Sequence, residues 1–517
     1  MADGVVLVGL PGSGKSIVGR LLAERLGRPF VDTDELVERR TGRSPAAIID
    51  EDGEPGFRAA ERAAIGAIQR GAVVATGGGA LNDPLNRWDL WQHGTAVWLR
   101  APEESLVARL AADSAVRPLL RSDPLGGLRR LAAERAPFYR AADHVVDAAR
   151  PPAVVAEELG RLAAPARRRL FDAEVERHHP FGPARARVVF GLGLELPADD
   201  RSSLVVDARL TSLQPGLIAS LGAARCMTLA GGERAKRMRT LERVLEWLAT
   251  SRVERGEAVV GVGGGTVGDL AGLAAALYAR GVPYVAVPTT WLAQADAALG
   301  GKVGVDLAGA KNAVGAFWPP WSVFADVAVL RTLPPRRLRD GLAEAVKAAM
   351  IGDPELWSLL EERGRAALRR DEAARYAITE RAARVKLGIV GRDPFEQGER
   401  RELNLGHTLA HALEIESGYR LAHGAAVALG LRAVAGIAAG RGADPDLGER
   451  LDSLLADLGF APRRTFDAAA VRDAMMADKK RLRGRQRWLL PMGIGQVTEV
   501  DDVSDAELGA ALERIGA

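Results

Sequence analysis

The chain has 517 residues, of which 47% are hydrophobic and 26% charged, and its 70 basic and 67 acidic residues leave a formal net charge of +3. This composition is ordinary for a globular protein of about three domains, and the balanced charge argues against a nucleic-acid-binding protein. No apolar run approaches the roughly 20 residues that a membrane helix needs, and no signal peptide follows Met1, so we expect a cytoplasmic protein without membrane contact. The single cysteine, Cys226, excludes an internal disulfide, and we expect its side chain to be small, apolar and buried.

The order of periodic segments predicts an α/β chain. Residues 1–162 alternate short apolar runs with helical stretches, which is typical of a parallel sheet covered by helices. Segment 163–186 is rich in Pro, Ala and Arg and is expected to be a linker. Residues 187–330 alternate again, whereas 331–517 are dominated by segments of helical period. The expected strands are Val5–Leu10, Phe30–Val31, Val73–Ala75, Ala96–Leu99, Val188–Phe190, Ser203–Val206, Ala258–Val262 and Tyr284–Val287.

Lysine is rare in this chain. Arginine supplies nearly all of the basic residues, so we expect lysine mainly where a compact ammonium group serves chemistry. The eight lysines are Lys15, Lys236, Lys302, Lys311, Lys347, Lys386, Lys479 and Lys480.

A phosphate-binding motif lies near the N-terminus. Gly9-Leu-Pro-Gly-Ser-Gly-Lys-Ser16 follows an apolar strand and precedes a helical stretch, the context that a P-loop requires. Gly12 and Gly14 let backbone N–H groups converge on phosphate oxygens, Lys15 can reach the β- and γ-phosphates, and the Ser16 hydroxyl suits Mg²⁺. The motif predicts ATP or GTP with a metal, but it leaves the acceptor open.

Polar residues after the P-loop indicate the acceptor. They comprise two aspartates after the second strand, a triple-glycine turn and three arginines, whose guanidinium forks suit a small carboxylated substrate. Residues 1–160 closely resemble shikimate kinase. The resemblance implies that Lys15, Ser16 and Asp32 serve the phosphates and Mg²⁺, while Arg117 lies on a mobile lid over the transferring phosphoryl group. It implies that Asp34 orients or deprotonates the acceptor hydroxyl. Shikimate would be held by Asp34, Arg58, Gly78, Gly79 and Arg135.

A second glycine-rich turn occurs downstream. Gly263-Gly-Gly-Thr-Val-Gly-Asp269 lies between an expected strand and a helix, so its backbone can approach a pyrophosphate. It is not a G-x-G-x-x-G fingerprint, and alone it leaves dinucleotide binding open.

The helical region carries candidate metal ligands. His407 and His411 share one helical face, His423 follows closely and Glu344 precedes them, a set that suits a divalent metal. His-x-x-x-His also occurs in zinc proteases, but Thr408 stands where these need a glutamate. The motif therefore argues against a protease.

Residues 186–517 strongly resemble 3-dehydroquinate synthase. The matching segments include Gly263–Asp269, Gly309-Ala-Lys-Asn312, Gly341-Leu-Ala-Glu-Ala-Val-Lys347 and Asn404–His411. The resemblance implies a Rossmann-like α/β domain and a helical metal-binding domain. NAD⁺ would be held by Asp207, Glu233, Lys236, Gly264, Gly265, Asp269, Thr289, Thr290 and Lys311. Zn²⁺ or Co²⁺ would be held by Glu344, His407 and His423. The substrate would be surrounded by Asp296, Lys302, Asn312, Lys347, Lys386, Arg400, Asn404, His411 and Lys480, of which Lys302, Lys347, Lys386, Asn404 and His411 would be catalytic. Arg280 would reach the substrate phosphate from a neighbouring subunit, which implies a homodimer.

We therefore predict a bifunctional shikimate-pathway enzyme that acts on small molecules. It would phosphorylate shikimate to shikimate 3-phosphate and convert 3-deoxy-D-arabino-heptulosonate 7-phosphate to 3-dehydroquinate. Asp306, Trp291 and Ala425 depart from the commonest synthase sequence, so another sugar-phosphate cyclase stays open, as does a metal-dependent polyol dehydrogenase. A third possibility is that the P-loop half senses ATP without catalysis.

Overall fold

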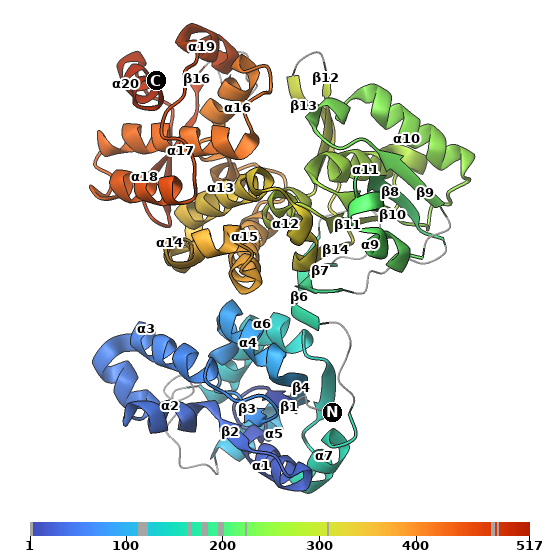
Figure 1. Ribbon diagram of the computed structural model, residues 1–517, viewed down its shortest axis with the longest axis vertical. Coiled ribbons are helices and arrows are strands. Elements are labelled where there is room, and N and C mark those ends of the chain that lie inside the picture. The colour runs from blue at the N-terminus through green and yellow to red at the C-terminus, as the bar shows by residue number, and fades with distance from the viewer. Residues whose placement is uncertain are drawn as a thin grey trace. The chain divides into compact units, whose positions relative to one another are not determined.

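The structure, a computed structural model, describes residues 4–111, 123–162, 168–177, 185–194, 201–222, 225–307, 310–476, 481–482 and 485–516. The chain divides into two compact units (Figure 1). The first unit comprises Met1–Glu174 with Val188–Leu194, and the second comprises Val175–Arg187 with Glu195–Ala517. Strands β6 (Arg168–Glu176) and β7 (Arg185–Leu192) are each divided between the units.

The first unit is built on a five-stranded parallel sheet of order β2-β3-β1-β4-β5. Its strands are β1 (Gly4–Val8), β2 (Phe30–Asp32), β3 (Val73–Ala75), β4 (Gly94–Arg100) and β5 (His144–Asp147). Its helices are α1 (Lys15–Leu26), α2 (Thr33–Thr41), α3 (Pro45–Ile65), α4 (Pro84–His93), α5 (Glu103–Ala111), α6 (Pro124–Arg140) and α7 (Pro152–Leu159), with a 3-10 helix at Ala80–Asn82.

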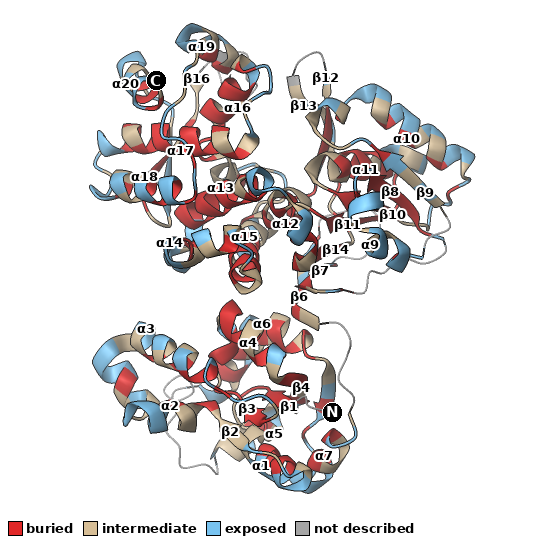
Figure 2. Ribbon diagram, viewed as in Figure 1, coloured by how far each residue is buried: buried red, intermediate tan, exposed pale blue. Residues whose placement is uncertain are grey.

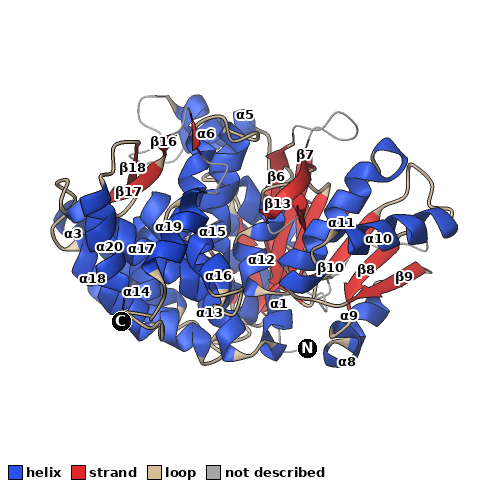
Figure 3. Ribbon diagram, turned by 90° about the horizontal axis from the view of Figure 1, so that it is seen from above, coloured by secondary structure: helices blue, strands red, loops and turns tan. Residues whose placement is uncertain are grey.

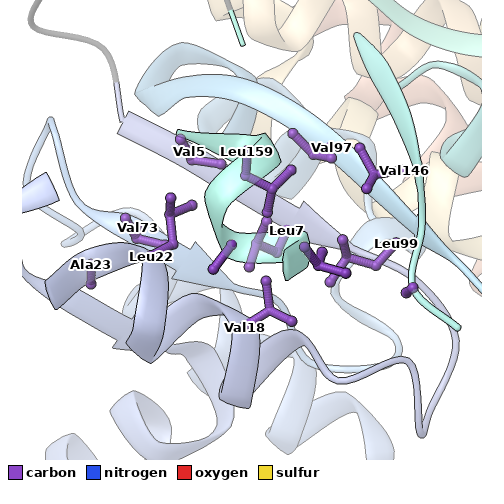
Figure 4. Packing of buried hydrophobic residues seen from close by; sticks show 13 residues of the cluster. Val5, Leu7, Val18, Leu22, Ala23, Val73, Val97, Leu99, Val146 and Leu159 are labelled. Carbon is purple, nitrogen blue, oxygen red and sulfur yellow. The ribbon is translucent and has the colours of Figure 1, made fainter. Parts of the chain in front are cut away.

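One apolar cluster fixes the sheet of this unit to two of its helices. Leu7 of β1 lies at its centre, and Val18, Leu22 and Leu159 reach it from α1 and α7 (Figure 4). These side chains are almost entirely buried. Burial of a Leu or Val side chain stabilises a fold by roughly 1.5–3 kcal/mol, so this contact holds α1, and with it the P-loop, against the strand ends.

The second unit contains five parallel strands of a seven-stranded sheet, in the order β14-β11-β10-β8-β9, with β9 at the edge. These strands are β8 (Ser203–Asp207), β9 (Arg225–Leu229), β10 (Val259–Gly263), β11 (Tyr284–Pro288) and β14 (Ser322–Asp326). The helices here are α8 (Leu210–Leu213), α9 (Pro215–Ser220), α10 (Met238–Thr250), α11 (Gly265–Leu277) and α12 (Trp291–Ala295). A hairpin of β12 (Lys302–Leu307) and β13 (Ala310–Phe317) packs against α11. Short 3-10 helices span Glu233–Ala235, Tyr278–Arg280, Ala297–Leu299 and Val327–Thr332.

The rest of the second unit is mainly helical, as the colouring by secondary structure shows (Figure 3). Its helices are α13 (Pro335–Gly352), α14 (Pro354–Leu368), α15 (Glu372–Arg392), α16 (His407–Glu416), α17 (His423–Ala439), α18 (Leu447–Asp457), α19 (Ala468–Met476) and α20 (Asp505–Ile515), with a 3-10 helix at Glu399–Asn404. Helices α13 and α17 are buried along most of their length (Figure 2). The site built on them is therefore held by a rigid core.

The predicted α/β fold class is confirmed, and every predicted strand is present with end shifts of up to three residues. Three details differ from the sequence analysis. Strand β6 lies inside the predicted linker, where Leu170, Phe171 and Ala173 are buried among the arginines. The helical region also holds two small hairpins, β15 (Arg481–Leu482) with β16 (Arg485–Gln486) and β17 (Trp488–Gly493) with β18 (Gln496–Val500).

Cys226 is the third difference, because its side chain is exposed rather than buried. Strand β9 is the last strand of its sheet, and its side chains alternate in exposure, with Cys226 and Thr228 outward. Among the described residues, no helix combines the length and the apolarity that crossing a membrane requires. The division of the second unit at residue 330 stays a prediction.

Candidate active sites

The P-loop of the first unit joins the buried strand β1 to α1. Gly12 and Gly14 adopt φ values of 81° and 86°, which glycine tolerates better than any other residue. The Lys15 ammonium donates hydrogen bonds to the carbonyl oxygens of Gly9, at 2.9 Å, and Leu10, at 3.1 Å. It is thereby held at the loop, where bound phosphates would lie.

Ser16 and Asp32 form the predicted Mg²⁺ position. The Ser16 hydroxyl donates to Oδ2 of Asp32 at 2.6 Å, although the two residues come from different elements. Asp32 also caps α2 by accepting a hydrogen bond from the backbone N–H of Asp34. A hydroxyl and a carboxylate oxygen are ligands that Mg²⁺ accepts, so this pair fits the metal that the P-loop motif implies.

The triple-glycine turn lies directly against the other predicted acceptor residues. A methyl group at Gly77 would overlap Oδ1 of Asp34, and one at Gly79 would lie 2.5 Å from Nη2 of Arg58. At Gly78, a methyl group would come within 3.3 Å of Nη1 of Arg135. The turn must therefore be bare for one carboxylate and two guanidinium groups to meet at the carboxyl end of β3.

The two arginines at this turn differ in their partners. Arg58 pairs with Glu61 at 2.8 Å and with Glu54 at 3.0 Å. Burial raises the pKa of Glu61, and the Arg58 cation only partly opposes it. Arg135 is 5% exposed, and its Nε and Nη1 have no hydrogen-bond partner among the residues that the structure describes. A buried guanidinium with unmet donors is costly, so its environment suits an anionic ligand.

Arg117, the predicted lid residue, lies outside the described residues.

The second unit contains a cavity of about 840 Å³. It is large enough for a dinucleotide together with a small substrate. The predicted residues that line it are Asp207, Glu233, Lys236, Gly264, Gly265, Asp269, Thr289, Thr290, Asp296, Lys302, Lys311, Asn312, Glu344, Lys347, Lys386, Arg400, Asn404, His407, His411 and His423. Arg280 does not line this cavity, and Lys480 falls outside the part of the chain that the structure describes.

One end of the cavity lies at the carboxyl ends of β8, β10 and β11, where open α/β sheets bind ligands. Gly264 caps α11, and a methyl group there would come within 2.9 Å of Cγ2 of Thr290. Lys236 forms an ion pair with Asp269, and burial raises the pKa of that carboxyl even though the lysine opposes the change. The free N–H groups at the start of α11 and these charges fit the pyrophosphate and ribose of NAD⁺.

The other end of the cavity holds a cluster of potential metal ligands. Glu344, His407 and His423 each direct a donor atom into one place, and these atoms all lie within 4.8 Å of one another. Nε2 of His423 lies 2.9 Å from Oε1 of Glu344, and Nε2 of His407 lies 3.3 Å from the same oxygen. Two imidazoles and one carboxylate with room for further ligands fit a catalytic divalent metal such as Zn²⁺.

Electrostatics in this cluster follow from its burial. Burial lowers the pKa of His423, but hydrogen bonds to Glu344 and Glu414 outweigh it and raise the pKa to about 10. Burial would raise the pKa of Glu344, yet Lys347 and the two histidines hold it well below its ordinary value. The carboxylate is therefore ionised and ready to bind a cation.

Close helix packing brings the three ligands together. Glu344 lies on α13, His407 begins α16 and His423 begins α17. Asp340, one turn before Glu344, accepts a hydrogen bond from the N–H of Gly424 at 3.0 Å and so caps α17 against α13. A methyl group at Gly430 would overlap the carbonyl oxygen of Gly406, the residue before His407. Glycine at this contact lets α16 and α17 approach closely enough for their histidines to face one metal.

Two buried lysines flank the cluster and share Asp296. Lys347 lies 3.7 Å and Lys386 2.9 Å from Oδ1 of this carboxylate. Burial lowers the pKa of Lys347, but Glu344 and Asp296 outweigh it and raise the pKa. For Lys386 burial prevails over Asp296, and the pKa is lowered. Lys347 is thus a fixed cation, whereas Lys386 gives up its proton more readily.

Among the cavity residues that the sequence analysis missed, three contact predicted ones. Glu396 pairs with Lys302 and accepts a hydrogen bond from Asn404 at 2.8 Å. Arg209 forms a two-armed contact with Asp207, at 3.0 and 2.5 Å. Glu414 contacts Lys311 and His423. None lies in a motif of its own, although Glu414 follows His407 by seven residues and hence lies on the same face of the helix.

Comparison with known proteins agrees with this geometry. The family model of shikimate kinase matches residues 11–163, and those of the N-terminal and C-terminal parts of 3-dehydroquinate synthase match 226–340 and 341–481. A 3-dehydroquinate synthase of Cereibacter sphaeroides is 42% identical over 308 residues, which cover 56% of this chain and 81% of the relative.

Other relatives have different names. A 2-epi-valiolone synthase of Actinosynnema mirum is 38% identical over 330 residues, which cover 61% of this chain and 86% of the relative. The solved structure of a 2-epi-5-epi-valiolone synthase of Streptomyces hygroscopicus, with NAD⁺ and Zn²⁺ bound, is 29% identical with a TM-score of 0.61. The match covers 66% of this chain and 99% of the chain in that structure.

The P-loop unit and the cavity with its glutamate and two histidines thus correspond to two matched enzyme types in one polypeptide. The chain belongs to the 3-dehydroquinate synthase family and is a fusion of a shikimate kinase domain with a 3-dehydroquinate synthase domain.

Proposed function

We propose that the first unit transfers the γ-phosphoryl group of ATP to shikimate. The observation that carries this proposal is Arg135, whose buried and unmet donors lie at the glycine turn beside Asp34 and Arg58. The substrate carboxylate binds these guanidinium groups, Asp34 orients the acceptor hydroxyl and accepts its proton, and Lys15 stabilises charge on the transferring group. Ser16 and Asp32 hold Mg²⁺, which offsets the phosphate charge when bound.

We propose that the second unit converts 3-deoxy-D-arabino-heptulosonate 7-phosphate to 3-dehydroquinate. The observation that carries it is the cavity that joins a dinucleotide-binding sheet edge to the cluster of Glu344, His407 and His423. When bound, NAD⁺ and the metal supply a reversible hydride acceptor and a Lewis acid.

The residues of this chain bind and orient the substrate. Lys302, Lys347 and Arg400 neutralise its phosphate and carboxylate, and Asn312 and Asn404 donate hydrogen bonds. Lys386, whose pKa is lowered, is suited to exchange a proton with the substrate. His411 lines the cavity outside the cluster of metal ligands, which supports a role facing substrate.

We also propose that the second unit acts as a homodimer. Arg280 is exposed, as is Leu277 three residues before it, and Arg280 does not line the cavity of its own chain. These features support its reaching the substrate phosphate of a partner subunit. Use of ATP and of sugar phosphates supports a cytoplasmic location.

The proposal is tested by supplying purified protein with the heptulosonate phosphate and, separately, with shikimate and ATP. We expect phosphate release without accumulation of NADH in the first assay and shikimate-dependent ADP formation in the second. Net NADH release would instead identify a polyol dehydrogenase, and absence of ADP formation would leave the P-loop unit without a catalytic role.

The valiolone synthase relatives favour a second candidate, a sugar-phosphate cyclase with another substrate. A heptulose phosphate that lacks the carboxylate, supplied as a test substrate, distinguishes the second candidate from the synthase. Faster turnover of that compound than of the heptulosonate phosphate would support the second candidate, and slower turnover would support the synthase.

A further inference from the structure

Glu414 is a buried carboxylate that contacts two functional side chains at once. It lies on α16, is 4% exposed and lines the cavity. Its Oε1 lies 3.3 Å from Nδ1 of His423, and both of its oxygens lie 3.2 Å from Nζ of Lys311. A buried carboxylate needs partners of this kind. Neither partner lies on α16, so Glu414 connects separate elements of the fold.

On one side, Glu414 fixes the orientation of His423. The ring directs Nε2 toward Glu344 at 2.9 Å and Nδ1 toward Glu414. A carboxylate at Nδ1 holds a proton there, so Nε2 is the nitrogen that a metal would bind. His407 is held in the same way by the backbone carbonyl of Leu405, 3.2 Å from its Nδ1. Of these two supports, only the one at His423 is a side chain that a substitution can remove.

On the other side, Glu414 restrains Lys311. The Lys311 side chain is 16% exposed, and its ammonium lies between Glu414 and Glu233, 3.3 Å from the latter. It also lies over the ring of Tyr419, 5.3 Å from the centroid. Because the ammonium is shared between Glu414 and Glu233, the Glu233 carboxylate keeps capacity to accept hydrogen bonds from a ligand such as a ribose.

We propose that Glu414 is a positioning residue shared by the metal site and the dinucleotide site, an inference that rests on the proposed synthase function. If its charge is removed, the hydrogen bond that holds the tautomer of His423 becomes weaker. Lys311 then pairs with Glu233 alone and masks the carboxylate that would hold the ribose. One substitution on α16 therefore weakens the binding of both ligands.

The test uses the full chain with Glu414→Gln, which keeps the shape of the side chain and removes its charge. Co²⁺ is titrated into metal-free protein and followed by its visible absorption, and NAD⁺ is titrated separately into metal-free protein by calorimetry. We expect Co²⁺ affinity to fall about tenfold with an altered absorption band, as for other outer-shell partners of metal ligands. NAD⁺ affinity is expected to fall roughly threefold or more, the scale of a partly buried ion pair.

Glu416→Gln is the matched control, because Glu416 lies on the same helix but contacts Arg464 and the backbone of Asp467 rather than the cavity. It should leave both affinities unchanged. Glu414→Asp keeps the charge and should bind NAD⁺ more tightly than Glu414→Gln. If the glutamine variant unfolds at a lower temperature, the aspartate variant provides the comparison with wild type. Kinase activity of each variant measures the concentration of intact chain.

The outcomes separate the two proposals. If wild-type protein binds neither Co²⁺ nor NAD⁺, the proposed synthase function fails. If wild-type protein binds both and Glu414→Gln binds either one as tightly as wild type, the shared positioning role is overturned.

Discussion

At the residue scale, two arginines of one pocket differ in the partners of their guanidinium groups. Arg58 and Arg135 both reach the glycine turn, but Arg58 is neutralised by Glu61 and Glu54, while Nε and Nη1 of Arg135 have no acceptor in the described part of the chain. An ionic partner already present lowers the gain from binding a further anion. Arg135 should therefore contribute more than Arg58 to the affinity for a carboxylated substrate.

We predict that Arg135→Lys raises the KM for shikimate about tenfold or more, with a smaller effect on kcat. The lysine keeps the charge but loses the two-armed contact, and a hydrogen bond between charged groups contributes roughly 1.5–3 kcal/mol. Steady-state kinetics of ADP formation measure the effect. Arg130→Lys, an exposed position on the same helix, is the control; an unchanged KM for Arg135→Lys would contradict the role.

Residues within contiguous motifs were predictable, and residues that act through distant partners were not. Lys15 and Ser16 belong to a P-loop whose spacing is itself the signal, and the histidine spacing around His407 is similarly informative. In the sequence Glu414 cannot be told from any other glutamate of a helix. Only the fold brings it beside Lys311, 103 residues away. Cys226 was expected to be buried because its segment is apolar, but the alternation of the edge strand turns it outward.

At the element scale, the packing of α16 against α17 sets the distance between two metal ligands. This contact depends on Gly406, whose φ is 74°, and on Gly430, which has no room for a Cβ. Most strands of the two sheets were predictable from their apolar runs, because burial dictates their composition, but β5, β6, β9 and β14 were not predicted. The β12–β13 hairpin was not, since its glycines and lysines do not form such a run.

We predict that Gly430→Ala lowers the thermal unfolding temperature and weakens Co²⁺ binding. The added methyl group must push α17 from the start of α16, and overpacking of this kind typically costs about 1–3 kcal/mol. Thermal unfolding and the cobalt titration check both effects. Gly391→Ala, in α15 with no atom within 4 Å of the new Cβ, should be neutral or slightly stabilising. Equal behaviour of the two variants would contradict the close-packing argument.

A second element-scale prediction concerns pH and the C-terminal helix α20. A hydrogen bond from Arg441, together with those from Ser504, lowers the pKa of Glu507 from its ordinary value of 4.5 to about 2. A carboxyl group with a lowered folded-state pKa stabilises the fold above its unfolded-state pKa and loses this contribution as the pH falls through the folded-state value. The stability difference between wild type and Glu507→Gln should therefore be constant above about pH 5 and shrink between pH 4.5 and 2.

Urea unfolding of the two proteins between pH 7 and pH 3 measures this difference. Glu513→Gln, at an exposed position on the same helix, is the control and should show little difference from wild type at any pH. A difference for Glu507→Gln that stays the same down to pH 3 would contradict the assignment.

At the scale of the whole molecule, each compact unit carries its own proposed site. The kinase residues described above all lie in the first unit, and the cavity residues all lie in the second. The reactions proposed for the two units are not consecutive steps, so neither site needs the product of the other.

We predict that Lys15→Ala abolishes ADP formation and leaves phosphate release from the heptulosonate phosphate within about twofold of wild type. His407→Ala should do the reverse. Removal of one group that stabilises developing charge typically lowers kcat by roughly 10²-fold or more. Both assays on each variant check the prediction, and loss of both activities from either substitution would contradict the two-site arrangement.

The exposed position of Cys226 makes this chain suitable for labelling at a single place. It is the only cysteine, and it lies on β9, which ends two residues before Gly231 in the cavity wall. Burial raises the pKa of the thiol somewhat, so maleimide coupling should proceed best slightly above neutral pH. One fluorophore per chain, attached without engineering, would report cofactor binding in the second unit while the first unit stays unlabelled.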